Sequence, residues 1–411
     1  MVRYRDSDPE KWILKEHTTI KHEILGKYLN PWARILSKYN KRLVVIDGFA
    51  GRGEYINPDG HSQVGGSPII LMNLNNQPII EELICICVEK NTDNYNNLCR
   101  VIEERLSVIL NHKEGIDPNS IQLFKAPCLS DLIEHMRSQS TFRYHFQNLK
   151  NQTTKLYIIN DEFEKIVLTV LKEFQSGQGG GNLKPAPGFY FIDPFGFHGV
   201  PFEIIKNILK LPKSEVLLTF MSRDINRFNP LKQEKDALVS LFGNEDWKAE
   251  VSKRGEEGQE AFVNYYRQCL KDIGIKYVIK FKIAETGRKQ SLYYLIHASN
   301  DFTAAEKMKE TMYYINPDYA YHGPEHKKLD KNQVRLDIRT HPLKEQLMKT
   351  FQGQSCTFEK IRGVTVDTNI FIEKDYRSVI KELEKEGVIE VKRVESKKTG
   401  IKDKDIISFR S

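Results

Sequence analysis

Apolar runs alternate with amphipathic stretches along most of the chain. Several runs of four to seven apolar residues end at an acid, a glycine or another turn residue, which is typical of buried strands in a parallel sheet. We predict strands at 42–47 (RLVVID), 82–89 (ELICICVE), 188–193 (GFYFID) and 215–221 (EVLLTFM), with a weaker one at 121–124. Each is bounded by polar or helical sequence.

The stretches between these strands have apolar residues three and four positions apart, the spacing of one helical face. This spacing predicts helices over 10–39, 67–75, 91–110, 129–137, 154–174, 201–210, 230–242 and 258–273. Pro31 is expected to break or kink the first helix, because proline lacks the amide hydrogen that a helix interior needs. Strands that alternate with helices predict an α/β domain with a mostly parallel sheet.

The sheet is expected to end in a hairpin. Strands predicted at 277–284 and 291–298 are separated by only six residues, 285–290 (ETGRKQ). A parallel crossover needs a longer connection, so the two strands should pair antiparallel. The predicted α/β domain therefore covers residues 1–321, and the polar stretch 322–340 is expected to be a linker.

Residues 341–411 are predicted to form a second domain. Apolar positions indicate a helix around 343–351, the start of another at 356–361, and a third over 375–386. Two strands follow, at 388–394 and 405–409, joined by the charged stretch 395–404. Helices followed by a hairpin with a basic tip are typical of a winged helix.

Composition limits the class of protein. The 411 residues contain 62 Lys and Arg against 55 Asp and Glu, and the net charge of +7 permits an anionic partner without requiring one. A hydrophobic content of 40% excludes a wholly disordered chain. The six cysteines include no CxxC pair, so we expect reduced core thiols and no metal site. No signal peptide or membrane span is predicted, which favours a cytoplasmic protein.

The strongest local signal follows the first strand. Asp47 ends that strand, and the turn after it, 48–54 (GFAGRGE), contains three glycines that allow a tight turn and close approach to a ligand. An acid at this point suits a cationic ligand such as the amino-acid end of S-adenosylmethionine. Glu89 ends the next strand, where a carboxylate can accept hydrogen bonds from ribose hydroxyls. The alternative is a glycine-rich turn with a helix-capping aspartate.

A second acid, Asp193, ends the strand at 188–193 and begins the sequence Asp-Pro-Phe-Gly. Its carboxylate and the carbonyl of Pro194 are both able to accept hydrogen bonds from an exocyclic amino group. Phe195 is placed to stack on a planar base. The alternative is a strand-ending turn with a buried aromatic residue.

The distribution of these motifs resembles the three-Cys-motif partner family. The matching segments are 24–29 (ILGKYL), 45–55 (VIDGFAGRGEY), 66–68 (GSP), 191–196 (FIDPFG) and 293–298 (YYLIHA). The family is similar to class I S-adenosylmethionine-dependent methyltransferases and is named after a neighbouring three-cysteine protein that resembles radical S-adenosylmethionine enzymes. The resemblance implies a Rossmann-like sheet, S-adenosylmethionine as cofactor, and such a protein as a possible partner.

The resemblance also implies roles for individual positions. Asp47, Glu89 and the loop residues Gly48, Phe49, Ala50, Gly51 and Gly53 match the cofactor site, and Lys21 and Ser67 match further pocket positions. Asp193, Pro194 and Phe195 stand where amino-methylating enzymes carry Asp/Asn-Pro-Pro-Tyr/Phe, and are the predicted catalytic residues. Phe195 replaces the second proline of that motif and Gly196 replaces its aromatic residue.

The C-terminal hairpin supplies a candidate nucleic-acid surface. Its basic residues are Lys392, Arg393, Lys397, Lys398, Lys402 and Lys404, of which the first five are the predicted nucleic-acid contacts. Winged helices often place a helix in a groove and the hairpin on the phosphate backbone. The alternative is a solvated charged hairpin or a module that binds protein.

Three functions therefore remain. The first is a methyltransferase that acts on an exocyclic amino group of a nucleic-acid base, DNA or RNA. The second is a catalytically altered, cofactor-binding recognition subunit for a three-Cys-motif partner. The third is a nucleotide-dependent oxidoreductase, which Asp47 disfavours because it would face a pyrophosphate.

Overall fold

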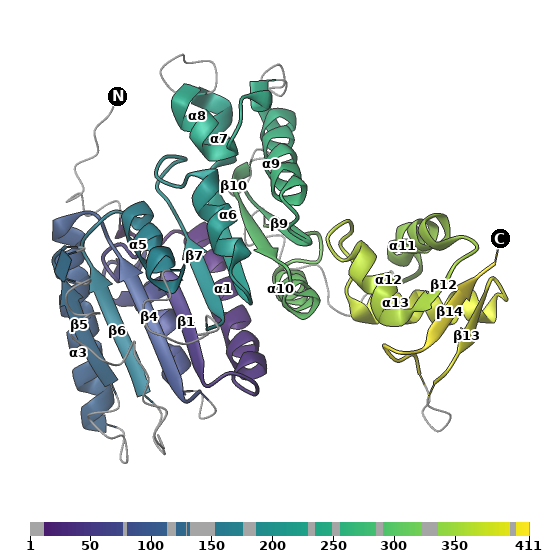
Figure 1. Ribbon diagram of the computed structural model, residues 1–411, viewed down its shortest axis with the longest axis horizontal. Helices are drawn as coiled ribbons and strands as arrows, with labels where there is room; N and C mark the ends of the chain where they lie inside the picture. The colour runs from purple at the N-terminus through teal and green to yellow at the C-terminus, as the bar shows by residue number, and fades with distance from the viewer. Residues whose placement is uncertain are drawn as a thin grey trace.

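A nine-stranded sheet organises the first 321 residues of the computed structural model (Figure 1). The structure describes residues 12–76, 80–112, 121–128, 130–131, 153–175, 186–228, 235–248, 255–284, 291–321, 336–394 and 400–410. In spatial order the strands are β11 (Ala320–Tyr321), β9 (Tyr277–Ala284), β10 (Ser291–Ser299), β8 (Ser214–Phe220), β7 (Gly188–Ile192), β1 (Arg42–Asp47), β4 (Glu82–Val88), β6 (Thr153–Ile159) and β5 (Ile121–Ala126).

The pairing confirms a mostly parallel sheet with an antiparallel hairpin. Strand β1 lies between β4 and β7 and runs parallel to both, and β6, β5 and β8 continue the parallel order. Strand β10 is antiparallel to both β8 and β9, as the short connection between β9 and β10 requires. The chain moves from β1 to β4 on one side and later returns to β7 on the other, so the strand order reverses beside β1.

Helices cover both faces of this sheet. One hydrophobic cluster joins the sheet to α1 (Glu16–Leu36), α2 (Ser67–Met72), α3 (Thr92–His112) and α10 (Phe302–Ile315). The other cluster joins it to α5 (Phe163–Gln175), α6 (Phe202–Lys210), α7 (Ser222–Phe228), α8 (Lys235–Phe242) and α9 (Gly255–Asp272). Burial on both faces explains why the central strands read as continuous apolar runs.

Two predicted elements differ from the structure, and a third lies mostly outside the described residues. Residues 154–174, predicted as one helix, form β6 and then α5, because the contiguous residues 156–159 are buried between β4 and β5. Helix α1 continues through Pro31 without a break. Of the helix predicted at 129–137, the structure describes only residues 130–131, which are helical.

The sequence patterns did not predict the hairpin of β2 (Glu54–Ile56) and β3 (Gln63–Gly65), the short strand β11, or helices α7 and α10. The helix predicted at 67–75 is α2 followed by the 3-10 helix η2 (Asn73–Asn76). Among the described residues, no helix combines the length and the apolarity needed to cross a bilayer.

The C-terminal domain is a winged helix with its own core. It consists of α11 (Leu336–Phe351), β12 (Ser355–Thr357), α12 (Phe358–Thr365), α13 (Glu373–Lys385), β13 (Ile389–Lys392) and β14 (Ile406–Phe409). The three strands form an antiparallel sheet in the order β12-β14-β13. Helix α11 begins inside the stretch 322–340 expected as a linker, and residues 322–335 of that stretch lie outside the described part.

Candidate functional site

Two acids meet at the carboxyl edge of the sheet where the strand order reverses. Asp47 is the last residue of β1, and Asp193 follows the last residue of β7, the strand beside it. The amide of Gly48 donates a hydrogen bond of 2.9 Å to the carbonyl of Phe191, which fixes the start of the β1 loop against β7. Ligands of open α/β sheets bind in the crevice at such a reversal.

Asp47 is a fully buried carboxylate whose acceptor capacity is only partly used. Its Oδ1 accepts a hydrogen bond of 3.2 Å from the amide of Phe49, and its Oδ2 has no hydrogen-bond partner among the described residues. Burial raises the pKa of Asp47 to about 7, although the Ser67 hydroxyl and the Phe49 amide favour the ionised form. A buried acid with an unfilled oxygen suits a cationic or hydrogen-donating ligand.

Backbone contacts fix the loop after β1, and two of its glycines are required by close neighbours. The amide of Ala50 donates to the carbonyl of Val88 at 2.9 Å, which ties the loop to β4. A Cβ at Gly48 would lie 2.6 Å from the ring of Phe163. Gly53 has a φ of +83°, and its Cβ would lie 2.7 Å from Leu98. The chain therefore passes too close to α3 and α5 for larger residues here.

Glu89 joins the loops that follow β1 and β4. Its Oε2 accepts a hydrogen bond of 2.8 Å from the amide of Gly51, and its Oε1 accepts one of 2.7 Å from the amide of Asn91. The side chain is buried. An ionised carboxylate has about four acceptor positions, so each oxygen keeps capacity for a further donor such as a ribose hydroxyl.

Asp193 is paired with a lysine from α1. The Nζ of Lys21 forms an ion pair with Oδ2 of Asp193, and the two side chains are 7% and 19% exposed. Lys21, predicted from the resemblance as a cofactor-pocket residue, thus contacts the predicted catalytic acid. Its ammonium also lies 5.7 Å from the centre of the Tyr293 ring.

Three aromatic side chains without a predicted role surround this ion pair. Burial and the adjacent Lys21 ammonium lower the pKa of His22 to about 3, so its imidazole is neutral. The ring of Tyr55 lies 5.5 Å from His22, and the hydroxyl of Tyr293 donates to the carbonyl of His17 at 3.1 Å. Their positions in α1, β2 and β10 are distant in sequence, so only the fold reveals the cluster.

Phe195 presents an aromatic face at the edge of this cluster. Its side chain is 66% exposed, whereas Pro194 beside it is buried. Its ring meets that of Trp12 edge to face, at 6.3 Å between centroids and 87° between planes. An exposed ring held by a neighbour in this way can stack on a planar ligand at little entropic cost.

The residues present fit an S-adenosylmethionine-like cofactor. The unfilled Oδ2 of buried Asp47 suits a cationic group, and Glu89 retains acceptor capacity for ribose hydroxyls. Ser67, which begins α2, is buried next to Asp47.

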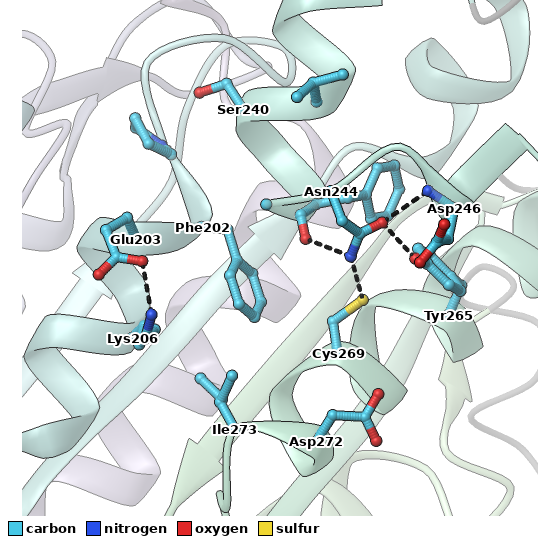
Figure 2. A pocket seen from close by; sticks show the side chains of 14 residues that line it. Phe202, Glu203, Lys206, Ser240, Asn244, Asp246, Tyr265, Cys269, Asp272 and Ile273 are labelled. Carbon is cyan, nitrogen blue, oxygen red and sulfur yellow. Dashed lines mark hydrogen bonds and ion pairs between the residues drawn. The ribbon is translucent and has the colours of Figure 1, made fainter.

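A hollow lies elsewhere, on the face covered by α6, α8 and α9 (Figure 2). Its volume is about 530 Å³. Asn244 lies at its centre and is bonded to Tyr265, Cys269 and its own loop. These hydrogen bonds use both the oxygen and the nitrogen of the Asn244 side-chain amide within the protein.

The predicted nucleic-acid residues divide into three groups. Lys392 and Lys402 are exposed. Arg393 is held by Glu384, with two hydrogen bonds of 2.7 Å from its guanidinium to the two carboxylate oxygens. Lys397 and Lys398 lie outside the described residues. All six cysteines are free thiols, and no group of three metal-ligating side chains occurs in the described part of the chain.

Comparison with known proteins identifies the C-terminal domain. The model of the GMT-like wHTH (winged helix-turn-helix) domain family matches residues 330–395. No curated protein gives a significant match. Among solved structures, the plantazolicin methyltransferase BpumL in complex with SAH is similar with a TM-score of 0.28 and 9% identity, covering 69% of this chain and 86% of that chain. The chain thus combines an α/β domain, built on a large and mostly parallel sheet, with a C-terminal winged helix-turn-helix domain.

Proposed function

We propose that this protein is an S-adenosylmethionine-dependent methyltransferase that acts on an exocyclic amino group of a nucleic-acid base. The observation that carries the proposal is the position of Asp47 and Asp193 on adjacent strands at the point where the strand order reverses. Asp47 is buried, and its Oδ2 accepts no hydrogen bond from the described residues, whereas Asp193 lies beside the exposed ring of Phe195. These are the groups that a cationic cofactor and a planar amine need.

Each group would have a defined task. Asp47 would bind the cationic amino-acid end of the cofactor, Glu89 its ribose, and the glycine loop would pass beneath it. When bound, S-adenosylmethionine supplies an activated methyl group, so the protein chiefly has to position the acceptor. The Asp193 carboxylate and the Pro194 carbonyl would accept hydrogen bonds from the target amine and stabilise the positive charge that develops on it. Phe195 would stack on the base.

The resemblance to the three-Cys-motif partner family also concerns the family and the partner of this chain. We propose that the chain is a member of that family, with an α/β domain up to residue 321 and a winged helix after the connecting stretch. In this account a three-cysteine protein is a candidate partner, and the winged helix brings nucleic acid to the protein.

A second function is favoured by the ion pair of Lys21 with Asp193. A lysine ammonium already occupies the carboxylate that a target amine would use. In this second account the protein keeps its cofactor pocket but works as a recognition subunit for a three-cysteine partner. The changed tetrapeptide Asp-Pro-Phe-Gly points the same way.

Calorimetric titration of the purified full chain with S-adenosylmethionine tests the cofactor half of both accounts. We expect binding by the natural chain and none by Asp47→Ala. A folded natural chain that does not bind the cofactor at millimolar concentration would rule out both. Transfer of labelled methyl groups then separates the enzyme from the recognition subunit.

A further inference from the structure

The turn between α12 and α13 is buried against the α/β domain. Its residues Val366 and Ile372 are 3% and 6% exposed and belong to the same hydrophobic cluster as α1, α10 and the main sheet. In Figure 1 the winged helix lies beside α10 and β9. In helix-turn-helix proteins the N-terminal residues of the second helix contact base edges in the major groove. Here they face another part of the same chain.

Hydrogen bonds and an ion pair fix this contact. Asp367, in the turn, accepts a hydrogen bond of 3.0 Å from the amide of Val278 in β9 and forms an ion pair with Lys271. Its carbonyl accepts a bond of 2.8 Å from Arg267 of α9. Such bonds satisfy backbone groups at the edge of β9 and would be lost if the domain moved away.

A buried lysine adds a second point of attachment. Lys309 of α10 is 2% exposed and donates a hydrogen bond of 2.8 Å to Asn369 in the turn. Arg362 of α12 forms an ion pair with Glu306 of α10 and is 3% exposed. Separating the domains would expose these charges and the apolar residues packed around them.

The first turns of α13 face acidic side chains of α10. Lys374 and Arg377 of α13 line a small cavity of about 190 Å³ together with Glu306, Glu310 and Tyr314 of α10. A duplex whose major groove received α13 would bring its phosphates into this space. The cavity is too small for a duplex, and the carboxylates of Glu306, Glu310 and Glu373 offset most of the charge of the four basic side chains that line it.

The wing, by contrast, offers lysines that are free to contact phosphates. We define the wing as β13, β14 and the described residues between them, 393–394 and 400–405. Lys392, Lys402 and Lys404 are exposed, and their ammonium groups form no ion pair with any other described residue. Elsewhere in this domain Arg377 pairs with Glu373, and Lys344 pairs with Glu382 and Glu386. Exposed lysines that form no ion pair with another described residue also occur outside the wing, at Lys349, Lys360, Lys374, Lys381 and Lys385.

We infer that this winged helix-turn-helix domain binds duplex nucleic acid through its wing, while its helix-turn-helix face stays docked on the α/β domain. The inference rests on the proposed function for the nature of the ligand. It assigns contacts to the phosphate backbone and none to base edges by the start of α13. Binding should therefore be insensitive to duplex sequence and strongly salt-dependent.

Fluorescence anisotropy with the full chain tests this assignment. The probes are labelled duplex DNA and duplex RNA of about two helical turns (~20 bp), titrated at several salt concentrations. Lys392→Gln/Lys402→Gln is the wing variant, and Lys374→Gln is the matched control, an exposed lysine at the start of α13. We expect the wing variant to bind about tenfold more weakly and to lower the salt slope by nearly two, because each lost phosphate contact removes about 0.9. Lys374→Gln should bind as the natural chain does.

The opposite pattern, with binding lost in Lys374→Gln and kept in the wing variant, would overturn the inference. Absence of binding to either duplex at low salt would also overturn it, and cofactor calorimetry on the same sample then shows separately whether the proposed function survives. Hydrogen exchange adds an independent readout. The amides of residues 366–375 should keep their protection when the duplex is added, and their exposure would mean that the domain undocks to insert α13 into a groove.

Discussion

At the scale of single residues, Asp47 is the group on which the account depends most. The protein keeps a carboxyl group fully buried with one oxygen unfilled, although burial favours its neutral form. A group held in this way lowers stability and is typical of binding sites. The stability of the protein and the affinity for a cationic ligand should therefore depend oppositely on its ionisation.

The change Asp47→Asn should stabilise the folded protein at alkaline pH. The folded-state pKa of Asp47 is raised from 3.8 to about 7, so ionising the folded natural chain costs free energy as the pH rises between these values. The asparagine variant lacks this cost. Urea unfolding should show a small difference near pH 4 and a gain that grows to a plateau above pH 7, up to about 4 kcal/mol. A difference independent of pH would contradict the raised pKa.

Cofactor affinity should show the opposite pH dependence. Only the ionised Asp47 attracts a cation, and the fraction ionised rises tenfold per pH unit below a pKa of about 7. Calorimetry of the natural chain should therefore show S-adenosylmethionine binding that strengthens from pH 5.5 to 7 and levels off above. Affinity that is flat over this range would show that Asp47 does not face the cofactor.

Lys21 and Asp193 should be energetically coupled. Both side chains are largely buried, so removal of one partner leaves the other charge poorly compensated. We expect Lys21→Met and Asp193→Asn each to lower the free energy of unfolding by about 2–3 kcal/mol. The double variant should lose about 1–3 kcal/mol less than their sum, measured by urea unfolding. Strict additivity would mean that the ion pair contributes nothing to folding.

At the scale of elements, close contacts with neighbouring side chains restrict which residues the loop after β1 can contain. Gly48→Ala should lower the free energy of unfolding by about 1–3 kcal/mol, because the new Cβ would lie 2.6 Å from the Phe163 ring. Gly26→Ala is the matched control in α1. Its Cβ would lie 3.5 Å from Ile70, and alanine in a helix interior gains up to ~1 kcal/mol over glycine.

The same urea unfolding series decides this point. Gly48→Ala should unfold at lower urea concentration than the natural chain, and Gly26→Ala at the same or a higher one. Equal midpoints for the two variants would mean that the loop after β1 can move away from Phe163. Its packing would then not require glycine at position 48.

The sequence predicts best the strands that are buried on both faces, because burial alone determines their apolar residues. Strands β1, β4, β7 and β8 are buried on both faces and could be predicted because short apolar runs bounded by turn residues are typical of such strands. Strand β6 could not be separated from α5, since Leu156, Ile159, Phe163 and Ile166 also fit helical spacing. Its pairing with β4 and β5, a contact distant in sequence, decided its conformation.

The candidate site follows the same division. The positions of Asp47, Glu89 and Asp193 at the carboxyl edge of the sheet could be predicted because each lies at the end of a recognisable apolar run. The contact of Lys21 with Asp193 could not, because 172 residues separate them and helix α1 brings them together. The same holds for His22, Tyr55 and Tyr293, which gather around the ion pair only once α1, β2 and β10 are in place.

At the scale of the whole molecule, hydrogen bonds and ion pairs hold the winged helix against the α/β domain. Asp367→Ala should weaken this anchor, because it leaves the amide of Val278 and the ammonium of Lys271 without their partner. We expect faster hydrogen exchange in residues 366–375 and in β9, with exchange in α12 and β14 unchanged. Equal exchange in β9 of the variant and the natural chain would show that the anchor does not depend on Asp367.

We propose that Asp47 and Asp193 together serve methyl transfer to a nucleic-acid base. The most direct measurement is incorporation of labelled methyl groups from S-adenosylmethionine into total DNA and RNA by the natural chain and by Asp193→Asn, followed by mass spectrometry of the nucleosides. The account predicts a nucleoside methylated on an exocyclic nitrogen with the natural chain, and a loss of at least a hundredfold with Asp193→Asn. No labelled nucleoside from a chain that binds the cofactor, or equal product from both chains, would contradict it.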